Sequence, residues 1–453
     1  MNNLFSPRVE KFEFGYFLTN DAGNFIILNH EDYNKFISNN LDSQLRQRLE
    51  DNLILITNQN KQKAIKEYRA SKKQILNGPS LHIIVPTARC NQNCIYCHSP
   101  NAKVNEKGFD MTKETAKKVV DFIFQSPSKT LTIEFQGGEA LLNFDIVKFI
   151  VSYAKSLAGE LNKELKFTIV TNLSNMDEDK LSYLVKEKVW PCTSLDGPKE
   201  LHNLNRPNSF SYLKKWIPKV QKETLNRLSA ICVATKSSLN FPKQIVDSYI
   251  DFGFKRIWVQ PFHALGKAKI LKDKISFLAE DYVKFWQTMI EYIVDNDLPL
   301  KEVTASFLLR KVIKNENPLF VDLQSPCGAV INQLAYDYNG DIYSCDEGRM
   351  VDSDLFKVGD VDMKLSEVLK SPTACSLIGL SVNDLLHCDN CAFKPYCGVC
   401  PVLAYAENAS PVSKPNSFEC KVVKAQFRYL IKKYFSELSY KNKFDSWAST
   451  KDL

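Results

Sequence analysis

The chain has 453 residues, of which 44% are hydrophobic and 25% are charged, and its formal net charge is +7. At roughly 150 residues per domain this is material for about three domains, so a single small module and a mostly disordered chain are both excluded. Basic and acidic residues are mixed along the sequence and no apolar run reaches the roughly 18 residues of a membrane span, so neither a nucleic-acid partner nor a membrane partner is predicted.

Residues 1–78 are predicted to form a small module of their own. The apolar runs EKFEFGYFLT and NFIILN flank the turn-forming tetrapeptide NDAG, which predicts a hairpin. Residues 30–39 and 42–51 carry apolar side chains at helical spacing, and LILIT at 53–57 is expected to be a short strand. This combination is typical of a winged-helix-like module. The alternative is an N-terminal extension that only packs on the main domain.

From residue 79 to 265, six β-rich runs alternate with amphipathic helical stretches. This alternation predicts an α/β fold, either a doubly wound sheet or a barrel, with ligands at the carboxyl ends of the strands. Polar residues gather at those ends, among them Gly137-Gly138-Glu139 and Thr171-Asn172. The expected strands are residues 81–86, 131–136, 165–171, 189–196, 228–235 and 256–261.

The last part of the chain divides into three predicted regions. A helical connection is expected over 266–326, and a cysteine-rich domain over 327–436 that closes with a helix at 418–436. Residues 437–453 are expected to be a C-terminal tail.

Thirteen cysteines set this chain apart from an average protein. The start, MNNLFSPRVEKFEF, lacks the basic and apolar segments of a signal peptide, which predicts a cytoplasmic location. In a reducing compartment such cysteines do not form a disulfide framework, and clusters of them indicate metal ligation or redox chemistry. Most of them fall into two groups, one near residue 94 and one from residue 327 onward.

Cys90, Cys94 and Cys97 form a C-x3-C-x2-C motif after the first strand of the main domain. A structural zinc site needs four ligands, and His98 is the nearest candidate for the fourth. Three thiolates suit a 4Fe-4S cluster in which one iron has no protein ligand and stays open to a small molecule.

The motif resembles that of the radical S-adenosylmethionine (radical SAM) enzymes, with Tyr96 at the aromatic position, and the resemblance implies a partial (β/α)6 TIM-type barrel over 79–265. Gly137-Gly138-Glu139 resembles the segment that approaches the cofactor's amino group, and Ser194-Leu195-Asp196-Gly197-Pro198 the segment that contacts its ribose and carboxylate. It also implies that Tyr96 packs on the adenine, and that the reduced cluster cleaves S-adenosylmethionine to a 5'-deoxyadenosyl radical that takes a hydrogen atom from substrate. Arg206 is a candidate clamp for the cofactor carboxylate, with a surface arginine as the alternative.

The second group resembles the SPASM domain, which carries one or two auxiliary 4Fe-4S clusters. The resemblance implies one cluster on Cys327, Cys345 and Cys400, with its fourth ligand open, and another on Cys388, Cys391, Cys397 and Cys420. Two residues separate Cys397 from Cys400 where the general pattern has three, which puts the geometry at Cys400 in doubt. A zinc ribbon is the alternative, but its pairs are usually farther apart than Cys391 and Cys397.

Longer strings narrow the resemblance to the radical SAM/SPASM maturases of His-Xaa-Ser peptide systems. They are NDAG, SLDGPKELHNLNRP, SPCGAVINQLAYDYNGDIYSCDEGRM and PYCGVCPV. The resemblance implies an oxidoreductase that crosslinks a side chain of a ribosomally synthesised precursor peptide (RiPP maturation), whose leader the N-terminal module binds as an added strand. It also implies a one-electron reductant such as flavodoxin or ferredoxin. The alternatives are a sulfatase-activating maturase that forms formylglycine and a non-catalytic iron-sulfur or zinc scaffold.

Overall fold

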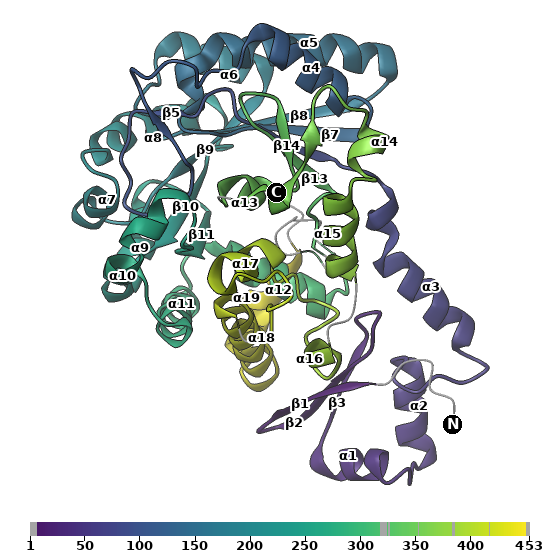
Figure 1. Ribbon diagram of the computed structural model, residues 1–453. Helices are drawn as coiled ribbons and strands as arrows, with labels where there is room; N and C mark the ends of the chain where they lie inside the picture. The colour runs from purple at the N-terminus through teal and green to yellow at the C-terminus, as the bar shows by residue number, and fades with distance from the viewer. Residues whose placement is uncertain are drawn as a thin grey trace.

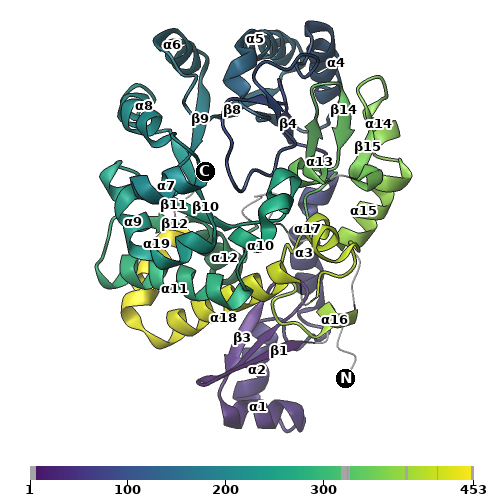
Figure 2. The same ribbon diagram turned by 60° about the vertical axis from the view of Figure 1, so that its left-hand side comes forward.

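The computed structural model describes residues 7–317, 324, 327–351, 353–382, 386–415 and 417–449. Figures 1 and 2 show one strongly curved sheet with helices along its outer face. The N-terminal module, drawn in purple, lies to one side of this sheet and beside the C-terminal helices. None of the helices in these ranges combines the length and the apolar character needed to cross a membrane.

Six parallel strands form the centre of the sheet, and strands that follow each other along the chain are neighbours in it. They are β4 (Leu81–Ile84), β7 (Thr130–Phe135), β8 (Glu164–Val170), β9 (Val189–Ser194), β10 (Ser229–Ala234) and β11 (Arg256–Pro261). Buried and half-buried residues alternate along β7 and β10, because one face of the sheet meets the helices and the other faces the concave side. All six strands coincide with predicted ones, and the predicted α/β architecture is confirmed.

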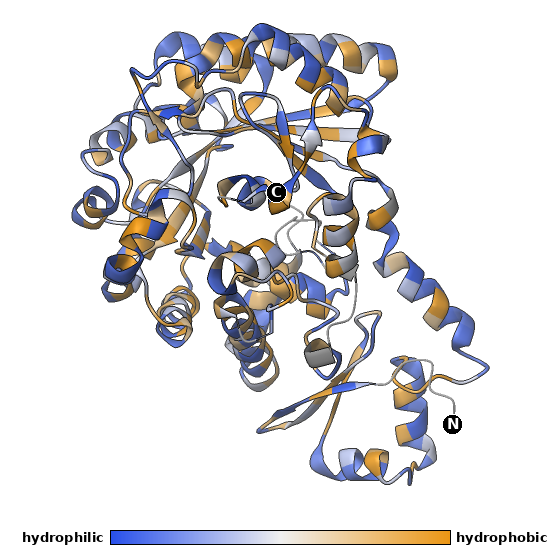
Figure 3. Cartoon of the chain, viewed as in Figure 1, coloured by the Kyte–Doolittle hydropathy of each residue, from blue (hydrophilic) through white to orange (hydrophobic). Residues whose placement is uncertain are grey.

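Amphipathic helices connect these strands and cover the outer face of the sheet. They are α4 (Lys113–Ile123), α5 (Phe144–Leu161), α6 (Glu178–Glu187), α7 (Lys199–Asn205), α8 (Phe210–Glu223) and α9 (Pro242–Asp251). Thr112 and Asp177 accept hydrogen bonds from backbone N–H groups in the first turns of α4 and α6, and so fix where these helices begin. In Figure 3 polar and apolar residues alternate along α4 and α5, as expected for helices half-buried on a sheet.

Both edges of the central sheet carry strands that the sequence pattern did not indicate. β12 (Lys301–Glu302) pairs with β11 at one edge, and β13 (Gln333–Tyr336) pairs in parallel with β4 at the other. β14 (Asp341–Tyr343) and β15 (Lys357–Asp360) continue the sheet antiparallel to β13. The boundary expected at residue 327 therefore runs through one continuous sheet and one continuous core.

Most of the described residues between β11 and Cys327 are helical. The two long ones are α11 (Ala279–Asp295) and α12 (Val303–Ile313), and α18 (Phe418–Ser436) follows the cysteines where a helix was predicted. Shorter helices of this half are α10 (Lys272–Ile275), α13 (Asp346–Met350), α14 (Leu365–Val368), α15 (Pro372–Val382), α16 (Leu386–Asp389) and α17 (Pro401–Asn408).

The expected C-terminal tail at 437–453 is wrong for the part that the structure describes. Residues Leu438–Ser449 form helix α19, which packs against α12. Tyr440, Phe444 and Trp447 on α19 are buried, and Ser306 Oγ of α12 donates a hydrogen bond to Trp447 O at 2.9 Å. Three large aromatic side chains give this segment enough apolar area to fold onto the protein.

The N-terminal module contains a three-stranded antiparallel sheet in the order β1 (Arg8–Phe12), β2 (Gly15–Thr19), β3 (Phe25–Leu28). The NDAG turn joins β2 to β3 as expected, with Asn20 Oδ1 accepting from the backbone N–H groups of Ala22 and Asn24. The predicted hairpin gains a strand because the run EKFEFGYFLT turns back on itself at residues 13–14. β1 and β3 lie at the edges of this sheet.

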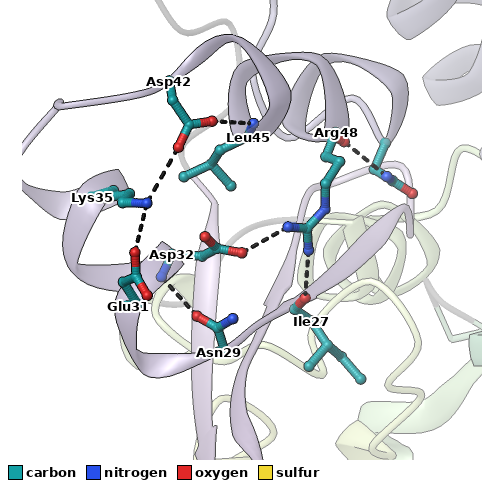
Figure 4. A network of polar contacts seen from close by, with 9 residues as sticks. Ile27, Asn29, Glu31, Asp32, Lys35, Asp42, Leu45 and Arg48 are labelled. Atoms are coloured by element: carbon teal, nitrogen blue, oxygen red, sulfur yellow. Dashed lines mark hydrogen bonds and ion pairs between the residues drawn. The ribbon is translucent and has the colours of Figure 1, made fainter.

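The helices of the module are α1 (His30–Ile37), α2 (Ser43–Asp51) and α3 (Lys61–Ser71). Figure 4 shows the polar contacts between the first two. Asn29 and Asp42 cap them, each accepting a backbone N–H at 2.8 Å, and Arg48 Nη1 pairs with the Asp32 carboxylate at 2.7 Å. Exposed ion pairs of this kind contribute about 0–1 kcal/mol each, so the buried core of the module supplies most of its stability.

Residues 53–57, LILIT, are not a strand, contrary to the prediction. Leu53 has a φ of 54°, the left-handed conformation that commonly follows a helix, and the N–H groups of Ile54 and Leu55 bond back to Leu49 O. The side chains of residues 53–56 are buried. A short apolar run fits a strand or a buried turn equally well, and here it closes α2 and fills the small core.

The module is joined to the cysteine-rich region through residues 389–397. Thr19 Oγ1 donates a hydrogen bond to Ala392 O at 2.8 Å, and Tyr396 Oη donates to Gly23 O, also at 2.8 Å. Both bonds are buried, so they are protected from exchange with water. The module therefore rests directly on a segment that carries two of the predicted auxiliary ligands.

Candidate active site

The first cysteine loop follows β4 at the carboxyl end of the central sheet and begins with β5 (Arg89–Cys90). Burial raises the pKa of the Cys90 thiol to about 12, and the charges of Glu139, Cys94 and Cys97 raise it further. Because each of these groups acts on Cys90 through its charge, the three thiols of the motif lie together beside Glu139. Buried thiols of this kind ionise when a metal replaces their protons.

Neighbouring segments hold the loop in place through the backbone. Ile95 N donates to Asn205 O at the end of α7, at 3.0 Å. On the other side Gly266 has a φ of 50°, and a Cβ at this position would lie 1.8 Å from His98 O. Only glycine fits so close to another backbone, so the loop is held from both sides.

Gly137 and Gly138 bring the loop after β7 against the residues that lead into Cys90. Gly138 N donates to Thr87 O at 3.0 Å, and a Cβ on Gly138 would lie 2.2 Å from Arg89 O. Gly137 has a φ of 124°, and a Cβ there would lie 2.4 Å from Thr87 O. The two glycines therefore make room for backbone of the cysteine loop, a role that stands beside their expected approach to the cofactor.

Replacing Gly138 with alanine is expected to lower the stability of the metal-free protein by about 1–3 kcal/mol, because backbone must move to admit the methyl group. Urea unfolding measures this change. Gly159→Ala is the matched control, since Gly159 lies in α5 with no atom within 4 Å of the added Cβ, and it should be neutral or stabilising by about 0.5–1 kcal/mol. Equal effects at the two positions would contradict the close packing.

Glu139 ties the ends of two strands together. It is 1% exposed, and its carboxylate accepts hydrogen bonds from Thr171 Oγ1 at 2.8 Å, Asn172 N at 2.8 Å and Leu141 N at 3.1 Å. Burial raises its pKa, and these bonds oppose the rise by stabilising the ionised form. The carboxylate is thus held in a fixed position next to the Cys90 thiol.

Tyr96, Asp196 and Arg206 form a buried polar chain beside Cys94. Tyr96 Oη donates to Asp196 Oδ2 at 2.8 Å, and Arg206 Nη1 donates to Tyr96 Oη at 3.0 Å. Burial raises the pKa of Asp196 to about 6 against the opposing effect of Arg206, which also lowers the pKa of Cys94. Arg206 is 9% exposed, so it is not the surface arginine that was the alternative. Its expected contact with the cofactor, and that of Tyr96 with the adenine, remain predictions.

Ser194 ends β9 and is half-buried, directly before Leu195 and Asp196. The segment turns here, and Asp196 N donates to His202 Nδ1 in the next helix, α7, at 3.2 Å. This places the predicted ribose-contacting segment at the same edge of the sheet as Cys94.

Four cysteines of the second region lie close enough to influence one another through charge. The charges of Cys391 and Cys420 raise the pKa of both Cys388 and Cys397, and burial brings that of Cys397 to about 12. Cys420 lies in the first turn of α18, where Ser417 caps the helix by accepting from Cys420 N at 3.2 Å. We refer to Cys388, Cys391, Cys397 and Cys420 as the four-thiol group.

A second set, the three-thiol group, consists of Cys327, Cys345 and Cys400. Burial raises the pKa of Cys400 well above its ordinary value, and Cys327 and Cys345 raise it further. All three side chains are buried. Cys345 precedes α13, and its Sγ accepts a hydrogen bond from Gly348 N at 3.2 Å. Figure 1 shows α13, the helix that Cys345 precedes, on the concave side of the sheet.

Two carboxylates lie beside the three-thiol group: Glu347, which the sequence offered as a proton acceptor with a solvated loop as the alternative, and Glu419, which the sequence did not indicate. Glu419 Oε2 accepts a hydrogen bond from Cys400 N at 2.8 Å. Glu347 follows Cys345 by two residues and shifts the pKa of both Cys345 and Cys400. Burial raises the pKa of each glutamate to about 7. Proximity to Cys345 in the sequence was a signal for Glu347, whereas Glu419 reaches the group only through the fold.

The donor set of the three groups is sulfur throughout, which suits iron-sulfur clusters. In the described ranges, no three His, Cys, Asp or Glu side chains are arranged to hold one metal ion. The buried thiols have raised pKa values, so they need cationic iron nearby to be present as thiolates.

The family model of the radical SAM superfamily matches residues 84–236, the part that carries the cysteine loop and the glycine loop. The chain is a radical SAM enzyme. It is 24% identical over 340 residues to a cysteine-type anaerobic sulfatase-maturating enzyme of Clostridium perfringens, which is 70% of this chain and 88% of that protein. It is also 26% identical to the radical SAM cyclopropyl synthase TigE of Paramaledivibacter caminithermalis, over 63% of this chain and 62% of that one.

Two solved structures share the fold of this radical SAM enzyme. Native anSMEcpe with bound AdoMet matches with a TM-score of 0.67 and 19% identity, over 81% of this chain and 99% of that one. SuiB of Streptococcus suis, bound to the precursor peptide SuiA, matches with a TM-score of 0.57 and 18% identity, over 92% of this chain and 100% of that one. As a radical SAM enzyme, the chain uses S-adenosylmethionine and 4Fe-4S clusters.

Proposed function

We propose that this radical SAM enzyme modifies a ribosomally synthesised precursor peptide and forms a crosslink at one of its side chains. The observation that carries the proposal is the N-terminal module, which has strand edges at β1 and β3 and rests on the segment of the four-thiol group. The match to SuiB bound to its precursor peptide covers 92% of this chain, whereas the match to anSMEcpe, which is also solved with bound peptides, covers 81%. The resemblance of SLDGPKELHNLNRP to maturases of His-Xaa-Ser systems adds support.

In this proposal each thiol group holds one cluster. Cys90, Cys94 and Cys97 hold the catalytic cluster, and the four-thiol and three-thiol groups hold auxiliary ones. When bound, the catalytic cluster and S-adenosylmethionine supply one-electron cleavage of the sulfonium and hence the hydrogen-abstracting species. A reductant such as flavodoxin or ferredoxin supplies the electron.

The chain's own residues provide position and exclusion of water. The backbone contacts of Gly138 and Gly266 hold the cysteine loop, and Glu139 is a fixed acceptor for the cofactor's ammonium group. Ser194 and Asp196 face the ribose and carboxylate. Asp196 and Arg206, both buried beside Cys94, keep water from this side of the site.

The N-terminal module captures the leader of the precursor peptide by strand addition. An edge strand presents unpaired N–H and C=O groups, and an added strand gains affinity from backbone hydrogen bonds with little dependence on side chains. At the β3 edge Arg48 Nη2 already donates to Ile27 O, at 3.5 Å. A peptide strand there would take the place of this long, weak contact.

A sulfatase-maturating activity is the second candidate, in which a cysteine or serine becomes formylglycine. The observation in its favour is the match to the Clostridium perfringens enzyme over 88% of that protein's length. A non-catalytic scaffold no longer stands as an alternative, because the chain is a radical SAM enzyme.

Incubation of the anaerobically reconstituted enzyme with a His-Xaa-Ser precursor, and separately with a cysteine-containing sulfatase peptide, tests the two candidates. We expect the precursor to lose two hydrogens and to resist fragmentation between the joined residues. Removal of the leader should abolish this product while sparing uncoupled cleavage of S-adenosylmethionine. An aldehyde in the sulfatase peptide with an unchanged precursor would overturn the proposal in favour of formylglycine formation.

Cys391→Ala tests the auxiliary assignment. Loss of one of four thiolates is expected to lower the iron content by up to one cluster per chain while uncoupled cleavage of S-adenosylmethionine persists. Cys375→Ala is the matched control, because Cys375 is exposed and lies outside all three thiol groups. Unchanged iron in Cys391→Ala would argue against ligation by this residue.

A further inference from the structure

Lys311 on α12 is a buried cation beside the four-thiol group. It is 4% exposed, and its Nζ donates a hydrogen bond to Tyr396 O at 2.6 Å. In the described part of the chain no carboxylate pairs with it. Lysine is among the residues least often fully buried unless a partner of opposite charge is present. Burial lowers the pKa of Lys311 to about 7, and a negative charge nearby favours the charged form of a buried amine.

Lys311 and the proposed ligand Cys397 influence each other through charge. Cys397 raises the pKa of Lys311, and Lys311 lowers that of Cys397. The backbone oxygen that accepts from Lys311 belongs to Tyr396, the residue directly before Cys397. Cys397 in turn acts through charge on Cys420 and Cys391. The ammonium group therefore lies on the side of the four-thiol group that Cys397 occupies.

Other cations near this group are in contact with water. Lys394 and Lys414 lower the pKa of Cys388, but both are only half-buried, and Lys394 also pairs with the Asp389 carboxylate at 2.6 Å. Charges that reach solvent are screened, whereas a buried charge acts at a lower effective dielectric. Lys311 is thus placed to exert the larger effect.

We propose that Lys311 is the buried counter-cation of the cluster held by the four-thiol group and raises the reduction potential of that cluster. The inference rests on the proposed ligand assignment. A cluster on four thiolates is an anion, and it becomes more negative when it accepts an electron, so a fixed positive charge stabilises the reduced form more than the oxidised form. Lys311 acts as a positioning residue through its charge and need not touch substrate.

Replacing Lys311 with methionine removes the charge and keeps most of the length. We expect the ratio of reduced to oxidised cluster at a fixed poise to fall on the order of tenfold. The measurement is a potentiometric titration followed by electron paramagnetic resonance, made in the Cys94→Ala background so that the catalytic cluster does not contribute. The signal to follow is the component that Cys391→Ala removes.

Two further variants separate charge from packing. Lys311→Arg keeps the charge and should keep the potential, and Lys314→Met, three residues on and exposed, should leave both iron and potential unchanged. If Lys311→Met loses iron while Lys311→Arg retains it, the charge holds the cluster and the inference stands. A wild-type potential in Lys311→Met, or equal loss of iron in Lys311→Met and Lys311→Arg, overturns it. If Cys391→Ala removes no signal, the ligand assignment itself fails and the inference falls with it.

Discussion

Replacing Cys94 with alanine is expected to abolish production of 5'-deoxyadenosine from S-adenosylmethionine, because two thiolates do not retain the catalytic cluster. Cys94 is the member of the trio that Arg206 and Asp196 both influence through charge. Its loss therefore removes a ligand and also removes the thiol on which Arg206 and Asp196 act through their charges. Chromatography of the anaerobic reaction measures the product, and iron analysis should show a loss of up to one cluster per chain.

The matched control for this experiment is a cysteine of a different kind. Cys232 is fully buried in the core, at 0% exposed, and lies on β10 away from the loop. Cys232→Ser should therefore perturb packing and leave product formation in place. Persistent 5'-deoxyadenosine in fully reconstituted Cys94→Ala would contradict the assignment of the trio.

The central strands could be predicted because each is a local pattern. Buried and half-buried positions alternate within runs such as residues 131–136, and turn or helix signals separate the runs. By contrast β13 could not be assigned, because its pairing with β4 depends on contacts between residues about 250 positions apart. The run LILIT was ambiguous for a related reason, since only the end of α2 decides whether it extends or turns.

The cysteine motifs were readable because metal ligands repeat at fixed spacing. Spacing does not report which charges the fold places around a ligand. Tyr396 directly precedes Cys397 in the sequence, but Lys311 is 85 positions away from Tyr396 and belongs to no motif. The same holds for Arg206 and Tyr96, whose contact spans 110 positions. The electrostatic surroundings of the clusters therefore emerge only from the tertiary structure.

If the N-terminal module captures the leader as proposed, its contacts with residues 389–397 connect leader binding to the surroundings of the four-thiol group. Gly23 belongs to the turn between β2 and β3, and it accepts from Tyr396, whose own carbonyl accepts from Lys311. A peptide strand added to β3 would thus be separated only by the β2–β3 turn from Tyr396, which directly precedes Cys397 of the four-thiol group. This short route is a reason to measure auxiliary potentials with the leader peptide present and absent.

Arg206→Met is expected to destabilise the protein by about 3–5 kcal/mol, because it leaves the Asp196 carboxylate buried without the cation that offsets its burial. Asp196 is 0% exposed, so water cannot take the place of the guanidinium. Thermal and urea unfolding of the metal-free protein measure the loss. The matched control is Arg227→Met, since Arg227 is exposed and its guanidinium lies over the ring of Trp190, at 4.7 Å, and it should change stability by less than about 1 kcal/mol.

A double variant shows whether the charge of Asp196 is the cause. Arg206→Met combined with Asp196→Asn removes both charges, so part of the stability should return, since a neutral amide costs less to bury than an unpaired carboxylate. If Arg206→Met alone changes stability by less than about 1 kcal/mol, or if Asp196→Asn gives no recovery, the buried chain from Arg206 to Asp196 does not hold this side of the site together. Recovery of stability without recovery of S-adenosylmethionine cleavage would show that the charged pair of Arg206 and Asp196 serves the reaction as well as the fold, because the double variant lacks both charges beside Cys94.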